Sequence, residues 1–355
     1  MSTHSHLILL ILCYAIVTNG FMLSVHYSSS IKQQFHHDHY HYSTIITSSS
    51  NADDGDGRAG EDDIILTSLS PDISHDVRSV AETLWGSPES LGSVLMSQTD
   101  DHTIINDEEN ITNNVIVCHP NHQGEMPLPS SIPISQRFSY FEQQAQHAAD
   151  PRAQHSVGLL LWNGFTSTSE QTSIDSEASA RWHAAAAVQG NLDALAVLGG
   201  CLRTGTGVGK CKNIALGLRC IEYAASVGNP SGVNKKGAMM ESNDDYIGAM
   251  KLYRECFQDE SKRTNALLLF NLGYCLIHGG EGVGDHGDGD VQEGEKLWRD
   301  AVALAPDEGS EEAAWFLYQQ YSERGELIEA RRYLDTAADL GLEDAVATSK
   351  EARQL

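Results

Sequence analysis

The sequence predicts an all-α protein: a right-handed α/α superhelical solenoid of helix-turn-helix repeats, preceded by a long disordered N-terminal arm. Three observations support this prediction. Glycines recur at fixed offsets after an alanine, paired residues recur on a second helical stripe, and the composition changes from Ser, His and Asp to Ala, Leu and Gly near residue 134. Recurrence of the same residues in the same order is the signature of a repeat architecture.

The first helix of each repeat is defined by small residues at regular spacing. In the second repeat, Gly follows Ala194 by five residues, Leu by eight and Gly again by eleven. The final glycine predicts a turn, because glycine lets the chain reverse between antiparallel helices. The same order recurs in the first repeat at Ala153, Gly158, Leu161 and Gly164, and around Leu272, Gly273, Leu276 and Gly279.

The second helix of each repeat carries a bulky residue followed by two small ones. Trp182 precedes Ala186 and Ala187, and Gly190 ends the helix. Small residues on either helix let a neighbouring helix approach closely. Replacing Ala225 of a second-helix pair, or Gly199 of a first helix, by Leu should therefore destabilise the stack. The corresponding pairs are Ala224–Ala225, Cys256–Phe257, Ala301–Val302 and Ala337–Ala338, at spacings of 38, 32, 45 and 36 residues, which is typical of helical-hairpin solenoids with loops of variable length.

These residues resemble the Sel-one-like repeat family (SLR), a relative of the tetratricopeptide (TPR) repeat. The second repeat follows the family pattern A-x4-G-x2-Y-x2-G-x-G-V closely, with Leu202 at the position of the Tyr. The third repeat departs from it, because Lys236 precedes Gly237 where Leu is usual and Asn243 replaces the turn glycine. The resemblance covers residues 150–341 and implies about five stacked hairpins that hold other proteins.

The rest of the chain divides around these repeats. Residues 1–20 contain the apolar run Leu7–Val17, which suits a signal peptide and is too short for a membrane span. Residues 21–133 are Ser- and His-rich and then acidic, and we expect a low-complexity arm that is largely disordered. A short helix over 134–149 should cover the first repeat, and residues 342–355 should form a C-terminal capping helix.

The leader predicts the secretory pathway, with the ER lumen or the exterior as the destination. An uncleaved anchor is an alternative, because no Lys or Arg precedes the apolar run. A plastid is another, reached through a two-part leader, because Phe21 follows the expected cleavage site at Gly20. Asn110 begins an Asn-Ile-Thr sequon that the secretory route would make available for glycosylation.

The charge balance excludes two classes of partner. The chain has 49 acidic and 23 basic residues, a formal net charge of −26. Nucleic acids and anionic membrane surfaces both require a basic face. We therefore expect protein partners, no nucleic acid, and no membrane span once the leader is removed.

Six cysteines remain after the leader, an even number that permits pairing in an oxidising compartment. Several of them fall on apolar helical stripes, where cysteine is commonly a small buried hydrophobic residue. The sequence therefore favours buried free thiols and leaves disulfides open. The six are Cys118, Cys201, Cys211, Cys220, Cys256 and Cys275.

No catalytic, cofactor or metal motif is complete in the sequence. Thr204–Cys211 resembles a phosphate-binding loop but lacks its first glycine and the Ser or Thr after the lysine. No G-x-S-x-G, H-E-x-x-H or C-x-x-C motif occurs. We expect a non-enzyme without a cofactor, a structural metal or a small-molecule ligand. The run His36–His41 leaves a metal-binding arm as an alternative function, because flexible His-rich tracts bind transition metals.

The most consistent function is a scaffold or adaptor for other proteins. A few secreted members of the resembled family have been proposed to act on small molecules. An enzyme of that kind is therefore the alternative function. A partner should contact exposed positions of the first helices that stacking does not require, above all Lys235, Phe270 and Asn271. Phe270 could instead pack against the second helix of its own hairpin. Further candidates are Gln154, Ser156, Leu195 and Val197.

Overall fold

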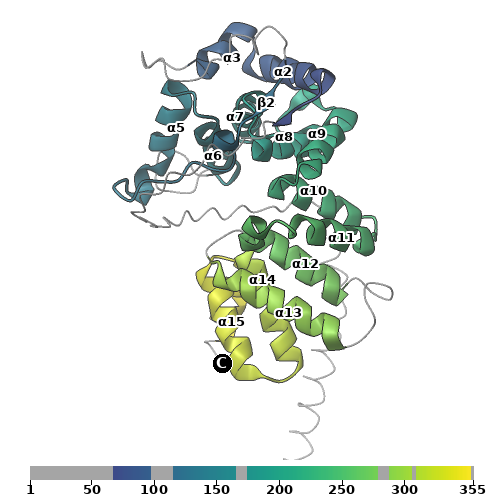
Figure 1. Cartoon of the computed structure of the whole chain (residues 1–355). Helices are drawn as coiled ribbons and strands as arrows, with labels where there is room; N and C mark the ends of the chain where they lie inside the picture. The colour runs from purple at the N-terminus through teal and green to yellow at the C-terminus, as the bar shows by residue number, and fades with distance from the viewer. Residues whose placement is uncertain (1–66, 97–114, 165–173, 279–287, 306–308, 353–355) are drawn as a thin grey trace, which may run out of the picture. The chain divides into compact units, whose positions relative to one another are not determined.

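A stack of helical hairpins runs through most of the computed structural model, which describes residues 67–96, 115–164, 174–278, 288–305 and 309–352 (Figure 1). Each helix from α5 to α16 packs against the next one in sequence, which confirms the predicted all-α stack of hairpins. The leader, the His-rich run and Asn110 lie outside the described residues.

The hairpins pair a first helix with a second one along the whole repeat region. A leading helix, α5 (Arg137–His147), and a final helix, α16 (Glu343–Ala352), occupy the spans expected for the two ends of the stack. The hairpins are α6 (Pro151–Trp162) with α7 (Ser176–Val188), α8 (Leu192–Thr204) with α9 (Ile214–Ser226), α10 (Pro230–Glu241) with α11 (Tyr246–Cys256), α12 (Ala266–His278) with α13 (Asp288–Ala303), and α14 (Ser310–Glu323) with α15 (Leu327–Asp339).

Local sequence fixes where these helices begin. The Oδ1 atom of Asn191 accepts a hydrogen bond from the backbone N–H of Ala194 at 2.8 Å. Asn229 makes the same bond to Gly232 at 3.0 Å, and Asn265 makes it to Leu268 at 2.9 Å. Each bond satisfies a donor that the first turn of a helix leaves unpaired. An asparagine at the same place before α8, α10 and α12 therefore sets the register of three repeats.

A glycine inside the first helix of four hairpins, α6, α8, α10 and α12, marks the contact with the second helix. A β-carbon on Gly199 of α8 would lie 2.8 Å from the carbonyl oxygen of Gly217 on α9, and a β-carbon on Gly217 would lie 2.5 Å from that of Gly199. The backbones of the two helices therefore meet at this point. Gly273 of α12 faces the backbone of α13 in the same way, since a β-carbon on it would lie 2.9 Å from the carbonyl oxygen of Gly294.

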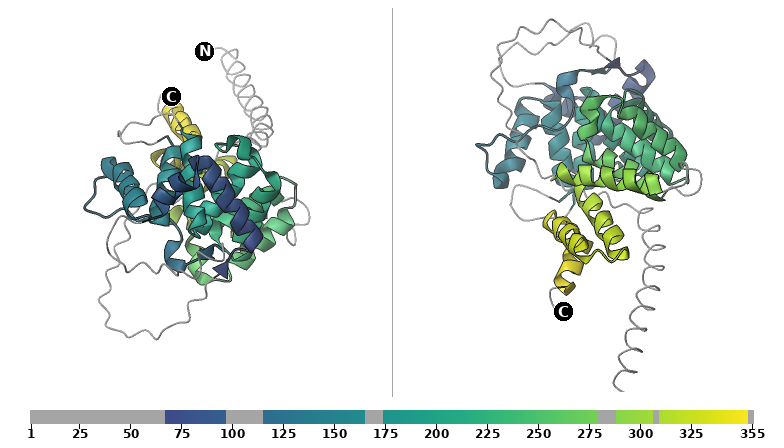
Figure 2. Two further views of the ribbon diagram at one scale, coloured as in Figure 1. Left: turned by 90° about the horizontal axis from the view of Figure 1, so that it is seen from above. Right: turned by 60° about the horizontal axis from the view of Figure 1, so that its bottom comes forward.

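The N-terminal boundary of the folded unit differs from the prediction. Residues 21–133 were expected to be largely disordered, which is wrong for the parts that the structure describes. Helices α2 (Pro71–Trp85) and α3 (Pro88–Leu95) form there, and strand β1 (Thr67–Ser68) pairs antiparallel with β2 (Val117–Cys118). Figure 2, left, shows the dark blue α2 lying across the teal helices, and its contacts are with α7 and α9.

The reason for this extra layer lies in α7. Within that helix only Ser176, Glu177 and Arg181 are not buried, so almost its whole circumference needs a covering. A helix that is apolar on all sides is stable in water only when it is enclosed. The hairpin partner α6 and the next helix α8 enclose part of it, and α2 supplies the rest with the fully buried Val77 and Ala81.

Replacing Trp85 by Ala should destabilise the folded unit by about 2 kcal/mol, because a half-buried tryptophan loses its packing. The Trp85 ring packs edge-on against Trp182 at 5.1 Å, and its Nε1 donates to the carbonyl oxygen of Arg181 at 2.9 Å. The urea unfolding midpoint measures the change. Arg219→Ala, which removes exposed ion pairs to Asp72 and Asp76, should shift the midpoint much less. Equal midpoints for Trp85→Ala and the unmodified chain would show that α2 is not part of the cooperative unit.

Candidate partner-binding site

Two of the three predicted contact residues are partly exposed and lie on consecutive first helices. Lys235 of α10 is half-buried, and its Nζ would lie 3.7 Å from a β-carbon placed on Gly200 of α8. Asn271 of α12 is also half-buried, and its Nδ2 donates a hydrogen bond to Oδ1 of Asn234 on α10. Three successive repeats thus meet at this place.

Phe270 is not a surface residue, so its prediction as a contact residue is wrong. Only 5% of it is exposed, and its ring lies 5.5 Å from Phe316 and 6.2 Å from Trp298 of its own hairpin. The Nε1 atom of Trp298 donates to the carbonyl oxygen of Phe270 at 3.0 Å. One helical position separates Phe270 from Asn271, and this rotates the two side chains by about 100°. The further candidates Gln154, Ser156, Leu195 and Val197 are buried as well.

Tyr274 completes the site and was missed in the sequence. It lies one turn after Asn271 on α12, is half-buried, and stands edge-on to Phe316 at 5.6 Å between ring centroids. His278 follows one further turn along, with its ring 4.7 Å from that of Tyr274. Spacings of three and four residues place side chains on one helical stripe, and this signal would have found Tyr274. We call Gly200, Lys235, Asn271 and Tyr274 the first-helix surface.

The surroundings of Tyr274 favour its neutral form. Desolvation, with smaller contributions from the nearby acidic groups Tyr246, Glu241 and Cys275, raises the pKa of its hydroxyl to about 12. The hydroxyl therefore stays neutral at physiological pH. A neutral phenol offers a partner both a donor and an acceptor on an aromatic body, a combination that is common at protein interfaces.

A buried pair of histidines lies below one end of this surface. The Nδ1 atoms of His155 on α6 and His183 on α7 are 3.1 Å apart, so one imidazole donates and the other accepts. Desolvation lowers the pKa of His155 to about 4, with Asp193 raising it and Lys235 lowering it to a smaller extent. The pKa of His183 is lowered mainly by desolvation and then by His155 and Lys235. Both rings are therefore neutral at pH 7.

Glu241 forms a second buried polar contact, between α10 and its neighbours. Its Oε1 accepts from the hydroxyl of Tyr253 at 2.7 Å and lies 3.5 Å from the thiol sulfur of Cys275. Desolvation raises the pKa of Glu241, and these two hydrogen bonds lower it in part. The hydroxyl of Tyr253 also lies against Gly237, where a β-carbon would overlap it. Gly237 therefore keeps its place in the third repeat to make room for a side chain of the second helix.

The first four hairpins share the position of an internal glycine. Gly158, Gly199, Gly237 and Gly273 each leave no room for a β-carbon against the second helix of their own hairpin. In this glycine position the hairpins resemble Sel1-like repeats. The third repeat, which departs from the repeat pattern in sequence, still forms the continuous helix α10. The stack of hairpins therefore continues without a break through the repeat in which the motif is weakest.

The chain is similar to two solved structures at low sequence identity, whereas no family model and no curated protein matches it. A Sel1 repeat protein from Oxalobacter formigenes is 20% identical, covering 58% of this chain and 79% of that one, with a TM-score of 0.41. A protective antigen of uropathogenic Escherichia coli strains displaying an SLR fold is 19% identical, covering 61% and 51%, with a TM-score of 0.27. This chain thus spans about half the length of the antigen. Both TM-scores are below 0.5, and the repeat assignment rests on the helices and glycine contacts of this chain.

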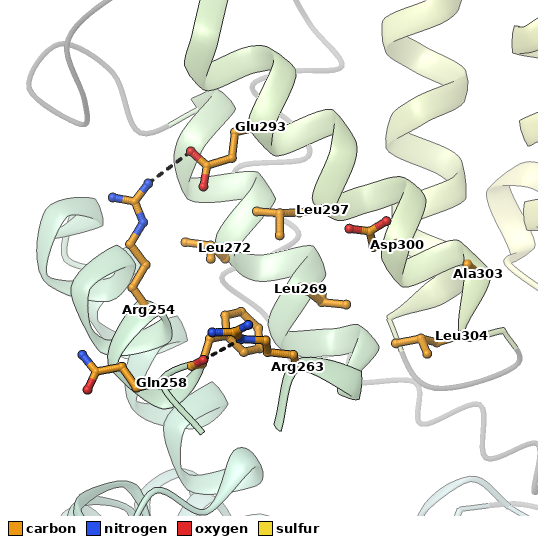
Figure 3. Close-up of a pocket in the computed structure, with 11 residues that line it drawn as sticks. Arg254, Gln258, Arg263, Leu269, Leu272, Glu293, Leu297, Asp300, Ala303 and Leu304 are labelled. Carbon is orange, nitrogen blue, oxygen red and sulfur yellow. Dashed lines mark hydrogen bonds and ion pairs between the residues drawn. The ribbon is translucent and has the colours of Figure 1, made fainter. Parts of the chain in front are cut away.

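A groove of about 500 Å³ lies elsewhere on the stack of hairpins, between α11, α12 and α13 (Figure 3). Leu269, Leu272 and Leu297 form much of its apolar lining, and an ion pair between Arg254 and Glu293 at 3.3 Å borders it. None of the residues of the first-helix surface lines the groove.

The remaining predictions concern cysteines, metals and the membrane. None of these six cysteines forms a disulfide, and all except Cys211 are buried. Burial raises the pKa of Cys201 to about 11 and that of Cys220 to about 12, so both remain thiols at neutral pH. In the described part of the chain, no group of three or more His, Cys, Asp or Glu could hold a metal ion. Nor does that part contain a helix with the length and apolar character to cross a membrane.

Proposed function

We propose that the protein is a non-catalytic scaffold that holds a partner protein on its first-helix surface. The observation that supports this proposal is that Lys235, Asn271 and Tyr274 lie on consecutive first helices, where each residue is only half-buried. A cation, an amide and a phenol provide hydrogen bonds and contact area to a partner. Partly enclosed aromatic and polar residues of this kind often dominate the binding energy of an interface.

The experiment starts from capture of partners by the full chain, followed by mass spectrometry. With the captured protein in hand, Lys235→Glu combined with Asn271→Ala should reduce its affinity by about tenfold, because central contact residues typically cost more than 1 kcal/mol. Lys251→Glu is the matched control, since Lys251 is exposed on the second helix α11. All variants should melt close to the unmodified chain. Equal affinity of the double variant and the control would refute the proposed surface.

We also propose that the protein enters the secretory pathway, as its apolar run Leu7–Val17 suggests. A fusion of residues 1–41 to a fluorescent protein should be translocated into the ER and lose its leader near Gly20. In the full chain, Asn110→Gln should abolish the change in gel mobility that deglycosylation produces. A reporter that accumulates in a plastid would favour the alternative leader that begins at Phe21, and a cytosolic reporter would contradict both.

A further inference from the structure

One segment of the chain, which forms neither α-helix nor strand, already lies on the first helices. We call residues 122–128 the strap. The Nδ2 atom of Asn191 donates to the carbonyl oxygens of His122 at 2.6 Å and Gly124 at 3.1 Å. The Oδ2 atom of Asp193 accepts from the N–H of Gly124 at 2.9 Å. Side chains at the start of α8 therefore bind the strap through its backbone.

Further contacts hold the strap on α6 and on the turn before α8. Oγ of Ser156 on α6 accepts from the N–H of Met126 at 3.0 Å. The Gln123 amide bridges the turn, with Nε2 donating to the carbonyl oxygen of Gly190 and Oε1 accepting from the N–H of Leu192, both at 2.9 Å. The burial of Gln154, Ser156 and Leu195, which the sequence did not predict, shows how much of this region is enclosed.

The strap alternates like an extended ligand. Gly124, Met126 and Leu128 are half-buried, whereas Glu125 and Pro127 between them are exposed. Met126 and Leu128 pack against the apolar core of the first repeats. A period of two is typical of an extended chain that presents one face to a surface. Because most of its polar contacts are made by backbone atoms, they can be reproduced by another polypeptide with small and apolar residues at alternate positions.

Asp193 connects the strap to the next repeat. Its Oδ1 accepts from Nδ2 of Asn229 at 3.0 Å and from Oγ of Ser231 at 2.6 Å, while Oδ2 is reserved for Gly124. The carboxylate also lies close enough to His155 to raise the pKa of that imidazole. Removal of the strap would leave Oδ2 ready to accept a backbone N–H from a different chain.

We propose that the strap is an internal competitor, and that the partner presents an extended peptide segment which replaces it on Asn191, Asp193 and Ser156. This inference rests on the proposed function that the first helices hold a partner protein, and it names the chemistry of that partner. A segment tethered in the same chain acts at a high effective concentration, on the order of millimolar for short linkers. A partner segment therefore binds well only when the strap is displaced, as for any site whose open state is a minor population.

The test uses the full chain and a labelled synthetic peptide with the sequence of residues 119–128 as the probe. Gly124→Pro should release the strap, because proline has no N–H for Asp193 and cannot adopt the φ of +73° found at Gly124. The released variant should bind the probe at least about tenfold more tightly than the unmodified chain. Gln123→Ala with Met126→Ser is a second releasing variant that leaves α6 and α8 unchanged.

A matched pair of substitutions locates the bound probe. Asn191→Asp in the released variant keeps a good N-cap for α8 but removes the Nδ2 donor, so the gain in affinity should be lost. Asn265→Asp makes the same change at the start of α12, away from the strap, and the gain should remain. Faster hydrogen exchange at the backbone N–H of position 126 reports release in both variants, and exchange at Gly124 reports it in the second variant.

Two results would overturn the inference. One is a probe that binds no more tightly to either releasing variant, and the other is a gain in affinity that survives Asn191→Asp. In both cases capture of a partner that still depends on Lys235 and Asn271 would leave the scaffold function standing. If the probe binds as expected but capture of the partner does not depend on Lys235 and Asn271, the inference about the strap would stand and the proposed first-helix surface would be wrong.

Discussion

Gly217→Ala should destabilise the folded protein by about 3 kcal/mol. A β-carbon at this position would lie 2.5 Å from the carbonyl oxygen of Gly199 and 2.9 Å from the backbone nitrogen of Arg203. Both neighbours are main-chain atoms of α8, so the overlap is relieved only by moving one helix away from the other. Overpacking of a tight core typically costs 1–3 kcal/mol and occasionally more. Urea denaturation of the full chain measures the loss.

Gly92→Ala is the matched control for this substitution. Gly92 also lies within a helix, α3, but a β-carbon there meets no atom within 4 Å. Alanine has a higher helix propensity than glycine, so this variant should be unchanged or stabilised by up to about 1 kcal/mol. If Gly217→Ala unfolds at the same urea concentration as Gly92→Ala, then α8 and α9 do not meet at these glycines.

Lowering the pH from 6.5 to 4.5 should destabilise the protein by about 2 to 3 kcal/mol through the buried histidine pair. The pKa of His155 is lowered by burial to about 4 in the folded protein, whereas an unfolded chain titrates near the ordinary value of 6.5. Between these values the unfolded state binds more protons, so stability is lost as the pH falls. Above pH 6.5 neither state is protonated and the full stability is present.

Substitutions distinguish the effect of the histidine pair on stability from that of other groups that titrate between pH 6.5 and 4.5. The pKa of Glu241 is raised by burial, so protonation of this carboxyl stabilises the folded state as the pH falls and opposes the histidines. His155→Asn with His183→Asn should lower stability at pH 7.5 but flatten its decline toward pH 4.5. His75→Asn, at a mostly exposed side chain, should leave the decline as it is in the unmodified chain. A decline that is equally steep in the double variant would assign the acid sensitivity to other groups.

The repeat was predictable because its determinants are local. The offset between Ala194, Gly199 and Gly205 follows from the geometry of one helix and the turn after it, and the structure places each of them as expected. The hairpin contact also explains why Gly237 persists in a degraded repeat, since it faces the hydroxyl of Tyr253. Contacts within one hairpin recur from repeat to repeat, so they produce a regular pattern in the sequence.

Contacts between segments that are far apart in the chain produce a weaker pattern in the sequence. Helix α2 was not predicted, because its own segment is polar and its partners follow about a hundred residues later. The nearly continuous burial of α7, with four alanines from Ala184 to Ala187, was nevertheless a sign that another element covers it. Phe270 was predicted to lie on the surface, but only the neighbouring Asn271 is partly exposed there. A repeat motif fixes the position of a helix more securely than the rotation of each non-motif residue.

The strap is a case where no pattern could be read in advance. Asn191 and Asp193 bind its backbone atoms, and a backbone donor or acceptor is present at almost every position of any sequence. Only the alternation of Gly124, Met126 and Leu128 reflects the contact in residue types.

The order of the helices along the chain has a consequence for synthesis on the ribosome. Trp85 of α2 donates a hydrogen bond to Arg181 of α7 across 96 residues, so α2 leaves the ribosome well before the helix it will cover. At ordinary rates of about 5–20 residues per second, this delay lasts about 5 to 20 s. During that time Val77 and Ala81 have no α7 to pack against. When α7 leaves the ribosome, α2 has already been synthesised and can cover it. The first two repeats can therefore be enclosed as soon as they form, whereas a chain synthesised in the opposite order would expose the alanine face of α7 for the whole interval.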